Sequence, residues 1–370
     1  MKICCVFNYN PLYRLPIFSA MDKEFDCDFY FGTSNPRRLP VQSFDPNQIK
    51  GFKKFIKTIP IKFTSYIWHS GTASIFSRRY THYILTGDMS MIINWLILLY
   101  AFFFRKKVYL WTHGAKTYDL NLKSSLMLKL FYKSATGILM YNHYNCQFME
   151  ALGIKRECLH VIHNSLDTDY QSELYAQLKP SNIYREYFGN DNPTLIYIGR
   201  IQKTKRTDLI LDAMHLLKEK SKPTNLVVIG ASLNDVLFEK KVKEYGLQNS
   251  IWMYGPCYDE IKNSELIYNA DVCVSPGNVG LTCIHVLSYG TPVITNNNFS
   301  TQMPEYEAIV EGKTGGYFEE GNIPQMAEQI EHWISLSSQQ REECRSVARK
   351  TILEEWSVDY QINLLKNLLK

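Results

Sequence analysis

The chain has 370 residues, which is more than one compact core usually holds and favours two domains. With 45% hydrophobic residues, 21% charged residues and 25 tyrosines, the composition is that of an aromatic-rich globular protein and excludes a disordered chain. Residues 1–185 hold 23 Lys or Arg against 12 Asp or Glu, whereas the remainder holds 18 against 24. The basic first half predicts contact with a polyanion or an anionic membrane face.

The cysteines and the N-terminus favour a cytoplasmic protein. The nine cysteines are odd in number and show no C-x-x-C or Cys/His ligand spacing, which indicates reduced thiols. The first apolar stretch, within MKICCVFNYN, ends after seven residues. It is too short for the core of a signal peptide and suits a first β-strand.

In the first half, short β-branched or aromatic runs alternate with helix-like stretches, as in a parallel sheet covered by helices. The expected strands are Lys2–Phe7, Tyr83–Thr86, Lys107–Thr112 and Thr136–Met140. The most apolar stretch, Met91–Phe104, has 14 residues, whereas a membrane span needs about 20. It predicts a buried helix, and insertion into a membrane interface beside Arg105–Lys107 is the alternative.

The densest basic run is Lys50–Phe63, KGFKKFIKTIPIKF, in which basic and apolar residues interleave on both sides of Pro60. Such a pattern is typical of a segment that lies on a membrane surface. A solvated basic helix face that packs on its own domain explains the pattern equally well.

The second half repeats the alternation of strands and helices. The expected strands are Thr194–Ile198, Asn225–Ile229, Ile251–Tyr254, Val272–Val274 and Pro292–Thr295. A polar stretch between Asn164 and Pro193 lacks a strand pattern and marks the junction. We therefore predict two doubly wound α/β domains, residues 1–185 and 186–350, and a C-terminal helix over 351–370 for which a return to the first domain is one option.

The segment LIYIGRIQKTKRTDLILDA predicts a phosphate site. Its strand ends at Gly199, which permits a sharp turn, and Arg200 and Lys205 follow where open α/β sheets bind ligands. Arg200 can bind two phosphate oxygens, and Lys205 can neutralise charge on a leaving group. By itself, the dipeptide Gly199-Arg200 is equally consistent with ordinary surface cations that follow a strand and bind no ligand.

The segment ADVCVSPGNVGLTCIHVLSYGTPVITNNN strengthens this prediction. After a strand and a Pro-Gly turn, Gly280 opens a helix whose first N–H groups suit an anion, and Thr282 adds a hydroxyl. The expected phosphate ligands are Val279, Gly280, Leu281 and Thr282. Many plain Rossmann-like cores contain the same strand, turn and helix.

Together, the ordered motifs GRIQKTK, VVIGAS, IWMYGPC, ADVCVSPGNVGLTCIHVLSYGTPVI and EAIVEGKTGGYF resemble the nucleotide-sugar half of the GT-B glycosyltransferases, specifically the retaining glycosyltransferase-4 family. The resemblance covers roughly residues 197–318, and HVIHNSLDTD at 160–169 is similar to the segment that precedes this half. It implies two Rossmann-like domains that face each other across a cleft, with the acceptor bound by the first and the donor by the second. The resemblance also implies that Tyr254, in the motif IWMYGPC, lies on the donor side of the site.

The first half resembles the family more loosely. KVYLWTHG looks like the segment whose histidine faces the transferred sugar, which implies a catalytic role for His113; without the resemblance it reads as a loop histidine. The loop at 8–21 lacks the family's usual glycines, and Tyr13 and Arg14 are its acceptor-side candidates. Asp88, which follows another strand, is a further acceptor-side candidate.

The chain departs from the family at a pair of glutamates eight positions apart, which are replaced by Gly277 and His285. The first usually contacts hydroxyls of the donor sugar and the second the ribose. His285 can still hydrogen-bond a ribose hydroxyl, whereas Gly277 leaves sugar recognition to another residue such as Asn278. Glu307 matches an acidic family position, with Glu305 as a substitute.

The resemblance implies a hexosyltransferase that retains anomeric configuration and uses neither a metal ion nor another cofactor, with Arg200 and Lys205 at the diphosphate. The sequence agrees with a metal-free site, since no D-x-D motif follows a strand. We expect a nucleotide-sugar donor and a glycan acceptor, lipid-linked as in capsule or lipopolysaccharide assembly, at the inner face of an anionic membrane. Nucleic acid is not expected, because no recognition module is present. A nucleotide-binding pseudoenzyme or scaffold and a sugar-nucleotide epimerase of the same fold are the alternatives.

Overall fold

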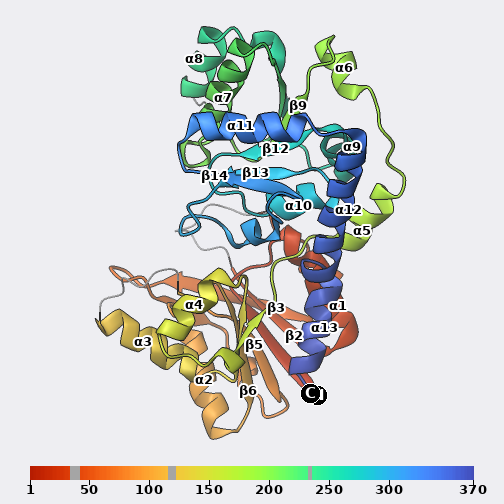
Figure 1. Cartoon of the computed structure of the whole chain (residues 1–370). Coiled ribbons are helices and arrows are strands. Elements are labelled where there is room, and N and C mark those ends of the chain that lie inside the picture. Colours follow the sequence, from red (N-terminus) through yellow and green to blue (C-terminus); the bar gives the residue numbers. More distant parts are fainter. Residues whose placement is uncertain (34–41, 116–121, 232–235) are drawn as a thin grey trace. The chain divides into compact units, whose positions relative to one another are not determined.

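The computed structural model describes residues 1–33, 42–115, 122–231 and 236–370. They form two compact units, Met1–Leu166 with Val358–Lys370, and Asp167–Ser357 (Figure 1). Each unit contains a sheet of mainly parallel strands covered by helices, so the predicted doubly wound α/β class is confirmed.

The sheet of the first unit has eight strands in the order β4-β3-β2-β1-β5-β6-β7-β8, and only the β3–β4 pair is antiparallel. Its strands are β1 (Lys2–Phe7), β2 (Asp26–Gly32), β3 (Phe52–Pro60), β4 (Ile67–Ser70), β5 (His82–Thr86), β6 (Lys107–Thr112), β7 (Gly137–Met140) and β8 (Leu159–Val161). Its helices are α1 (Leu15–Glu24), α2 (Ile92–Phe103), α3 (Leu122–Lys133), α4 (Tyr144–Ala151) and α13 (Val358–Leu368).

Helices cover both faces of this sheet. Along β1, Cys4 and Val6 join the core under α2 and α4, whereas Ile3, Cys5 and Phe7 join the core under α1 and α13. Successive side chains of a strand point to opposite faces, so a strand buried on both faces reads as a continuous apolar run. The run ICCVF follows from this position in the sheet.

The basic segment at 50–63 forms a strand, so the expectation of a helix face is wrong. β3 pairs with β2 in parallel and with β4 in antiparallel orientation. Its alternating pattern buries Ile56 and exposes Lys57, the period of a strand rather than of a helix. Phe63 lies fully exposed in the turn that follows.

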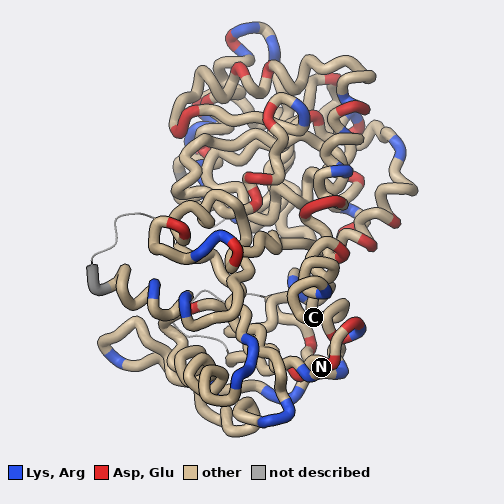
Figure 2. The backbone as a smooth tube through the Cα atoms, turned by 60° about the horizontal axis from the view of Figure 1, so that its bottom comes forward, with Lys and Arg blue, Asp and Glu red and all other residues tan. Residues whose placement is uncertain are grey.

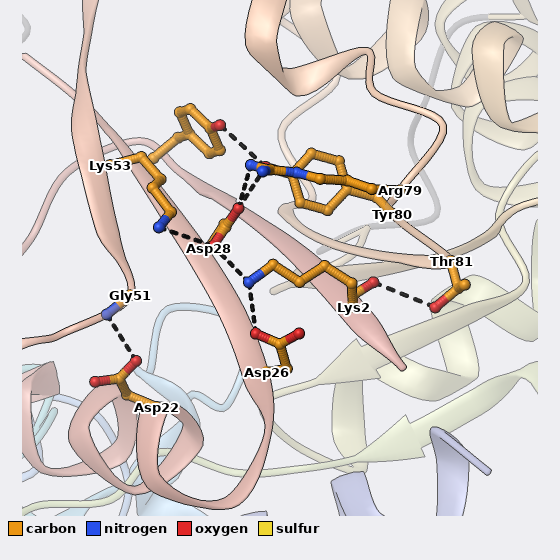
Figure 3. Close-up of polar contacts among 10 residues, drawn as sticks. Lys2, Asp22, Asp26, Asp28, Gly51, Lys53, Arg79, Tyr80 and Thr81 are labelled. Carbon is orange, nitrogen blue, oxygen red and sulfur yellow. Dashed lines mark hydrogen bonds and ion pairs between the residues drawn. The ribbon is translucent and has the colours of Figure 1, made fainter.

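A buried carboxylate joins the amino ends of four segments of this sheet (Figure 3). Asp28 on β2 has no exposed surface. Its Oδ2 lies 2.5 Å from Arg79 Nη2 and accepts a 2.7 Å bond from Tyr80, and its Oδ1 lies 2.8 Å from Lys2 Nζ and 3.2 Å from Lys53 Nζ. Burial would raise the pKa of Asp28, but its bonds from Lys2, Tyr80 and Lys53 outweigh that and lower it.

The second unit has a six-stranded parallel sheet in the order β11-β10-β9-β12-β13-β14. Its strands are β9 (Thr194–Ile198), β10 (Asn225–Ile229), β11 (Ile251–Gly255), β12 (Val272–Ser275), β13 (Val293–Asn296) and β14 (Gly315–Phe318). Its helices are α5 (Thr168–Tyr175), α6 (Ile183–Phe188), α7 (Asp208–Glu219), α8 (Val236–Glu244), α9 (Glu260–Asn269), α10 (Thr282–Ser288), α11 (Ile323–Ile334) and α12 (Ser338–Glu355). A core between this sheet and α7 and α11 holds the unit together.

The division between the units differs from the boundaries at 185 and 350. Residues 167–185 belong to the second unit, because α5 and α6 pack on α9 and Tyr184 donates a 2.5 Å hydrogen bond to Leu266 O. The second unit also extends through α12 to Ser357. α13 then lies against α1 in the first unit, where Lys366 Nζ is 2.6 Å from Glu24 Oε2.

Candidate functional site

The carboxyl edge of the second sheet is built on close backbone contacts between neighbouring loops. Gly199 after β9 has φ +146° and Gly230 after β10 has φ +152°, values that L side chains rarely adopt. A Cβ on Gly230 would lie 1.9 Å from Gly199 O. The two N–H groups donate to Ile229 O and Gly255 O at 2.8 and 2.9 Å. Gly199 therefore shapes the loop that carries Arg200.

Two cations follow β9. The Arg200 side chain is exposed, and its carbonyl accepts a 3.0 Å bond from the Tyr197 hydroxyl. Lys205 is half-buried, and its Nζ donates 2.6 Å hydrogen bonds to both the carbonyl and the side-chain oxygen of Asn278. Burial lowers the pKa of Lys205, the charge of Arg200 lowers it further, and Glu305 opposes this effect. The ammonium group of Lys205 is therefore fixed by Asn278 and lies within reach of the positive charge of Arg200.

Gly277 packs against the backbone of Thr204 and Lys205. Its N–H donates a 3.1 Å bond to Lys205 O, and a Cβ would lie 2.6 Å from Thr204 O. Its carbonyl accepts bonds from Thr295, Asn296 and Gln302 at 3.2, 3.1 and 3.3 Å. With this backbone, a side chain at this position would clash with the loop that carries Lys205.

Part of the predicted phosphate cradle is already hydrogen-bonded. The Val279 N–H donates a 3.0 Å bond to Gln302 Oε1, and the Thr282 hydroxyl donates a 3.0 Å bond to Ile198 O. Gly280 has φ +57°, and the nearest atom to its would-be Cβ is Met303 Cγ at 3.8 Å. A Cβ there would make ordinary van der Waals contact with Met303, and the turn leads through Leu281 into α10.

His285 on α10 belongs to a polar cluster. Its Nε2 lies 2.8 Å from Glu260 Oε1, which also accepts bonds from the Tyr289 hydroxyl at 2.7 Å and from Gln171 Nε2 at 3.2 Å. Burial would raise the pKa of Glu260, but His285 and the two other donors lower it. The carboxylate can only accept, so the His285 Nε2 carries the proton.

The remaining donor-side candidates lie on neighbouring elements. Tyr254 is half-buried near the end of β11, and burial raises its pKa. In the short helix Pro304–Ala308, Glu305 is buried and Glu307 is half-buried. Glu305 is the acidic residue that raises the pKa of Lys205, which supports it as the substitute for Glu307 near that cation.

The first unit places His113 directly after β6. The His113 ring lies 4.5 Å from the Tyr141 ring, and its carbonyl accepts a 2.8 Å bond from Asn145 Nδ2. Gly114 follows with φ +68°, and its N–H donates a 3.1 Å bond to Thr112 Oγ1. These two bonds fix the peptide group that joins His113 to Gly114.

The acceptor-side candidates fall into different settings. Arg14 is buried, donates a 2.6 Å bond to the Tyr141 hydroxyl and lies 4.4 Å from the centroid of the Trp111 ring. It therefore joins His113 through their common neighbour Tyr141. Asp88 accepts bonds from the N–H and hydroxyl of Ser90 at 2.9 and 2.6 Å, which is the role of a turn cap. Tyr13 is half-buried beside Arg14 in the chain.

Among the residues that the structure describes, no three His, Cys, Asp or Glu side chains are grouped as metal ligands. A reaction without metal or cofactor remains a prediction.

Residues 182–351 match the family model described as glycosyl transferases group 1. The second unit contains a glycosyltransferase domain. The predicted enzyme class is confirmed by this domain, which includes Arg200, Lys205 and His285. No curated protein matches the chain.

Solved structures resemble the whole chain. HepE (Alr3699) of Anabaena in complex with UDP superposes with a TM-score of 0.75 at 15% identity, over 100% of this chain and 99% of that one. A glycosyltransferase of Rickettsia africae gives 0.72 at 16%, over 100% and 97%. The lipopolysaccharide outer core galactosyltransferase WaaB gives 0.69 at 16%, over 100% and 99%. At such identities the likeness shows the fold alone, which is GT-B as predicted.

The structure adds residues that the sequence did not indicate. Gln302 and Asn296 fix the loop at Gly277, and Glu260 holds His285. Glu260 is the first residue of α9, 25 positions before His285, and belongs to none of the quoted motifs. A carboxylate that acts through a tertiary contact leaves no local pattern in the sequence.

Proposed function

We propose that the chain is a retaining hexosyltransferase that moves a sugar from a nucleoside-diphosphate donor to a hydroxyl of a glycan acceptor. The observation that carries the proposal is the position of Lys205. An ammonium group has three N–H donors, and two point at Asn278. Among the residues that the structure describes, none accepts the third, which can therefore bind a phosphate oxygen, and Arg200 follows the same strand with an exposed side chain.

The donor would be bound by three groups of this glycosyltransferase domain. Arg200 and Lys205 neutralise the diphosphate. With the proton of His285 on Nε2, its Nδ1 accepts a hydrogen bond from a ribose hydroxyl. UDP is the first nucleotide to test, because HepE has been crystallised with UDP and with UDP-glucose.

In the reaction, the bond between the anomeric carbon and the diphosphate oxygen breaks, and an oxocarbenium-like centre forms. Arg200 and Lys205 stabilise the charge that develops on the diphosphate. The acceptor hydroxyl attacks from the same face and gives its proton to the leaving phosphate oxygen. His113 remains the proposed sugar-facing residue of the first unit, and its ring is positioned by Tyr141.

The acceptor would be a lipid-linked glycan of surface polysaccharide assembly, at the cytoplasmic face of an anionic membrane. The basic first half and the likeness to WaaB support this choice. The acceptor-side candidate with the strongest structural support is Arg14, because it shares Tyr141 with His113.

The test is thermal stabilisation by UDP, GDP, dTDP, CMP and ADP of the parent, Arg200→Ala and Lys205→Ala. A diphosphate at about 100 times its dissociation constant should stabilise the parent by roughly 2.7 kcal/mol. We expect one diphosphate to stabilise the parent but neither variant. Stabilisation by none of them would overturn the proposal.

The side-chain-free Gly277 favours a second candidate, a protein that binds a nucleotide without transferring a sugar. An assay with the nucleotide-sugar and mixed glycan acceptors separates the two. Transfer predicts nucleotide release that rises with acceptor, whereas a scaffold releases none. Conversion of the donor to an isomer without acceptor would instead indicate an epimerase.

A further inference from the structure

Two helices of the first unit expose an apolar face. We define the α2–α3 face by six residues: Leu96, Leu99, Phe102, Phe103, Leu126 and Leu130. Phe102 is 78% exposed, Phe103 69% and Leu126 65%. Large apolar side chains that gather on the surface mark sites of contact with another molecule.

The start of α2 meets the end of α3. Trp95 on α2 and Phe131 on α3 place their ring centroids 5.1 Å apart, and Figure 1 shows α2 and α3 over the same side of the sheet. Ile93, Ile97 and Leu98 on α2 are buried against the sheet. The core therefore already uses one side of each helix, and burial within the unit does not account for the outer side.

The surroundings of this face are basic. Residues 89–149 contain seven Lys or Arg and a single acidic residue, Asp119, which lies outside the described residues. Arg78, Arg105 and Lys133 are exposed near the ends of the two helices, and the Arg78 guanidinium lies 5.3 Å from the centroid of the Phe104 ring. Figure 2, in which Lys and Arg are blue, shows several positive segments along the first unit.

We propose that the α2–α3 face docks on an anionic lipid surface. Apolar side chains would enter the boundary between headgroups and acyl chains, and the basic rim would meet the lipid phosphates. A second copy of the chain fits less well, because its basic rim would face another basic rim. α2 has 12 residues, and no helix in the described parts of the chain is long and apolar enough to cross a membrane, so the contact is interfacial.

This inference rests on the membrane partner of the proposed function and assigns it a surface. It replaces the basic run at 50–63, whose residues 52–60 form β3, as the principal contact. It does not depend on transfer chemistry, because lipid docking is measured without donor or acceptor.

The experiment is flotation of the full chain with vesicles of phosphatidylcholine alone or of equal parts phosphatidylcholine and phosphatidylglycerol. We compare the parent, the double variant Phe102→Ser/Phe103→Ser, and Phe63→Ser, which lies in the turn of the hairpin formed by β3 and β4. The matched control is Tyr258→Ser/Leu353→Ser, which removes exposed apolar residues of the second unit. Thermal stabilisation by UDP is recorded for each variant, so that failure of docking is distinguished from failure of the nucleotide site.

We expect the parent to float with the anionic vesicles and to be released by salt, because electrostatic attraction to anionic lipid contributes to interfacial binding. The Phe102→Ser/Phe103→Ser variant should lower binding about tenfold or more, because two large apolar groups no longer enter the interface. The control should bind like the parent.

Three results would overturn the proposal. The first is a parent that does not float. The second is loss of binding in Phe63→Ser with retention in the double variant, which would place the contact on the hairpin. The third is light scattering that shows a parent dimer and a monomeric double variant, because the face would then bind a second copy.

Discussion

His285 Nε2 on α10 lies 2.8 Å from Glu260 Oε1 on α9. The carboxylate that the sequence lacks on α10 is present one helix away, at the start of α9. An acceptor-only carboxylate fixes the imidazole tautomer with the proton on Nε2, so Nδ1 is the nitrogen that can accept a hydrogen bond.

Glu260→Gln should weaken nucleotide binding about tenfold, because an amide supports either tautomer of His285 and removes a charged hydrogen bond. The change should raise KM for the donor more than it lowers kcat. The matched control on the same helix is Glu265→Gln, whose carboxylate lies 3.5 Å from Lys262. An unchanged KM in Glu260→Gln would contradict the role of Glu260 in positioning His285.

Lys205→Met should lower kcat by about a hundredfold or more, because one charge that stabilises the leaving diphosphate is lost. The pKa of Lys205 is lowered by burial, so the protonated form and the activity should be lost, as pH rises, below the usual lysine range near 10.5. Lys205→Arg should keep partial activity and should not lose it as pH rises over this range, because a guanidinium group stays protonated. The exposed neighbour Lys203 provides the control Lys203→Met.

Gly277→Ala should impair the same loop without removing any functional group. The added Cβ would lie 2.6 Å from Thr204 O, a backbone atom, so the Lys205 loop must shift. We expect a cost of about 1–3 kcal/mol in thermal unfolding and weaker binding of the diphosphate. Gly189→Ala is the control. Its φ of +67° is unfavourable for alanine, but no other atom of the described residues lies within 4 Å of the added Cβ. Parent-like binding in Gly277→Ala would show that the loop is not fixed by this contact.

The sequence predicted those parts of the fold and site that depend on local patterns. Strand β9, Gly199 and the two cations follow one another within a single motif, and the structure places them at one sheet edge. β3 was missed because its lysines hide the two-residue alternation of Ile56 and its neighbours. The predicted boundary at residue 185 lies after the observed one, because α6 already belongs to the second unit. Tyr184 on α6 contacts Leu266, 82 positions later, and such a contact has no local signature in the sequence.

Asp28→Asn should destabilise the first unit by about 1–3 kcal/mol, because the buried carboxylate accepts from Tyr80 and from three cations, and an amide cannot satisfy all of these donors. The pKa of Asp28 is lowered in the folded protein, so its contribution is present above about pH 4 and is lost as pH falls through the folded value. Urea unfolding at neutral and acid pH measures both effects. Asp26→Asn, whose side chain is 65% exposed, should cost less than about 1 kcal/mol. Equal costs for the two variants would contradict the special role of the buried carboxylate.

Acid should destabilise the first unit through His163. Burial, with a smaller contribution from His143, lowers the pKa of His163 to about 3, and its Nδ1 lies 3.1 Å from Tyr141 O. The unfolded chain therefore binds the proton near pH 6.5 and the folded chain does not, so stability falls as pH drops below that value, by up to about 3 kcal/mol at pH 4.

The variant that tests this is His163→Asn, because φ at this position is +56° and asparagine tolerates the left-handed conformation. The variant should show a shallower loss of stability between pH 6.5 and 4 in urea unfolding, and the exposed His332→Asn should keep the parent's slope. Since His163 contacts Tyr141, which also contacts Arg14 and His113, the variant reports on the same region of the first unit. A parent-like slope in His163→Asn would assign the acid sensitivity to other groups, among which His69 and His82 also have pKa values lowered to about 4.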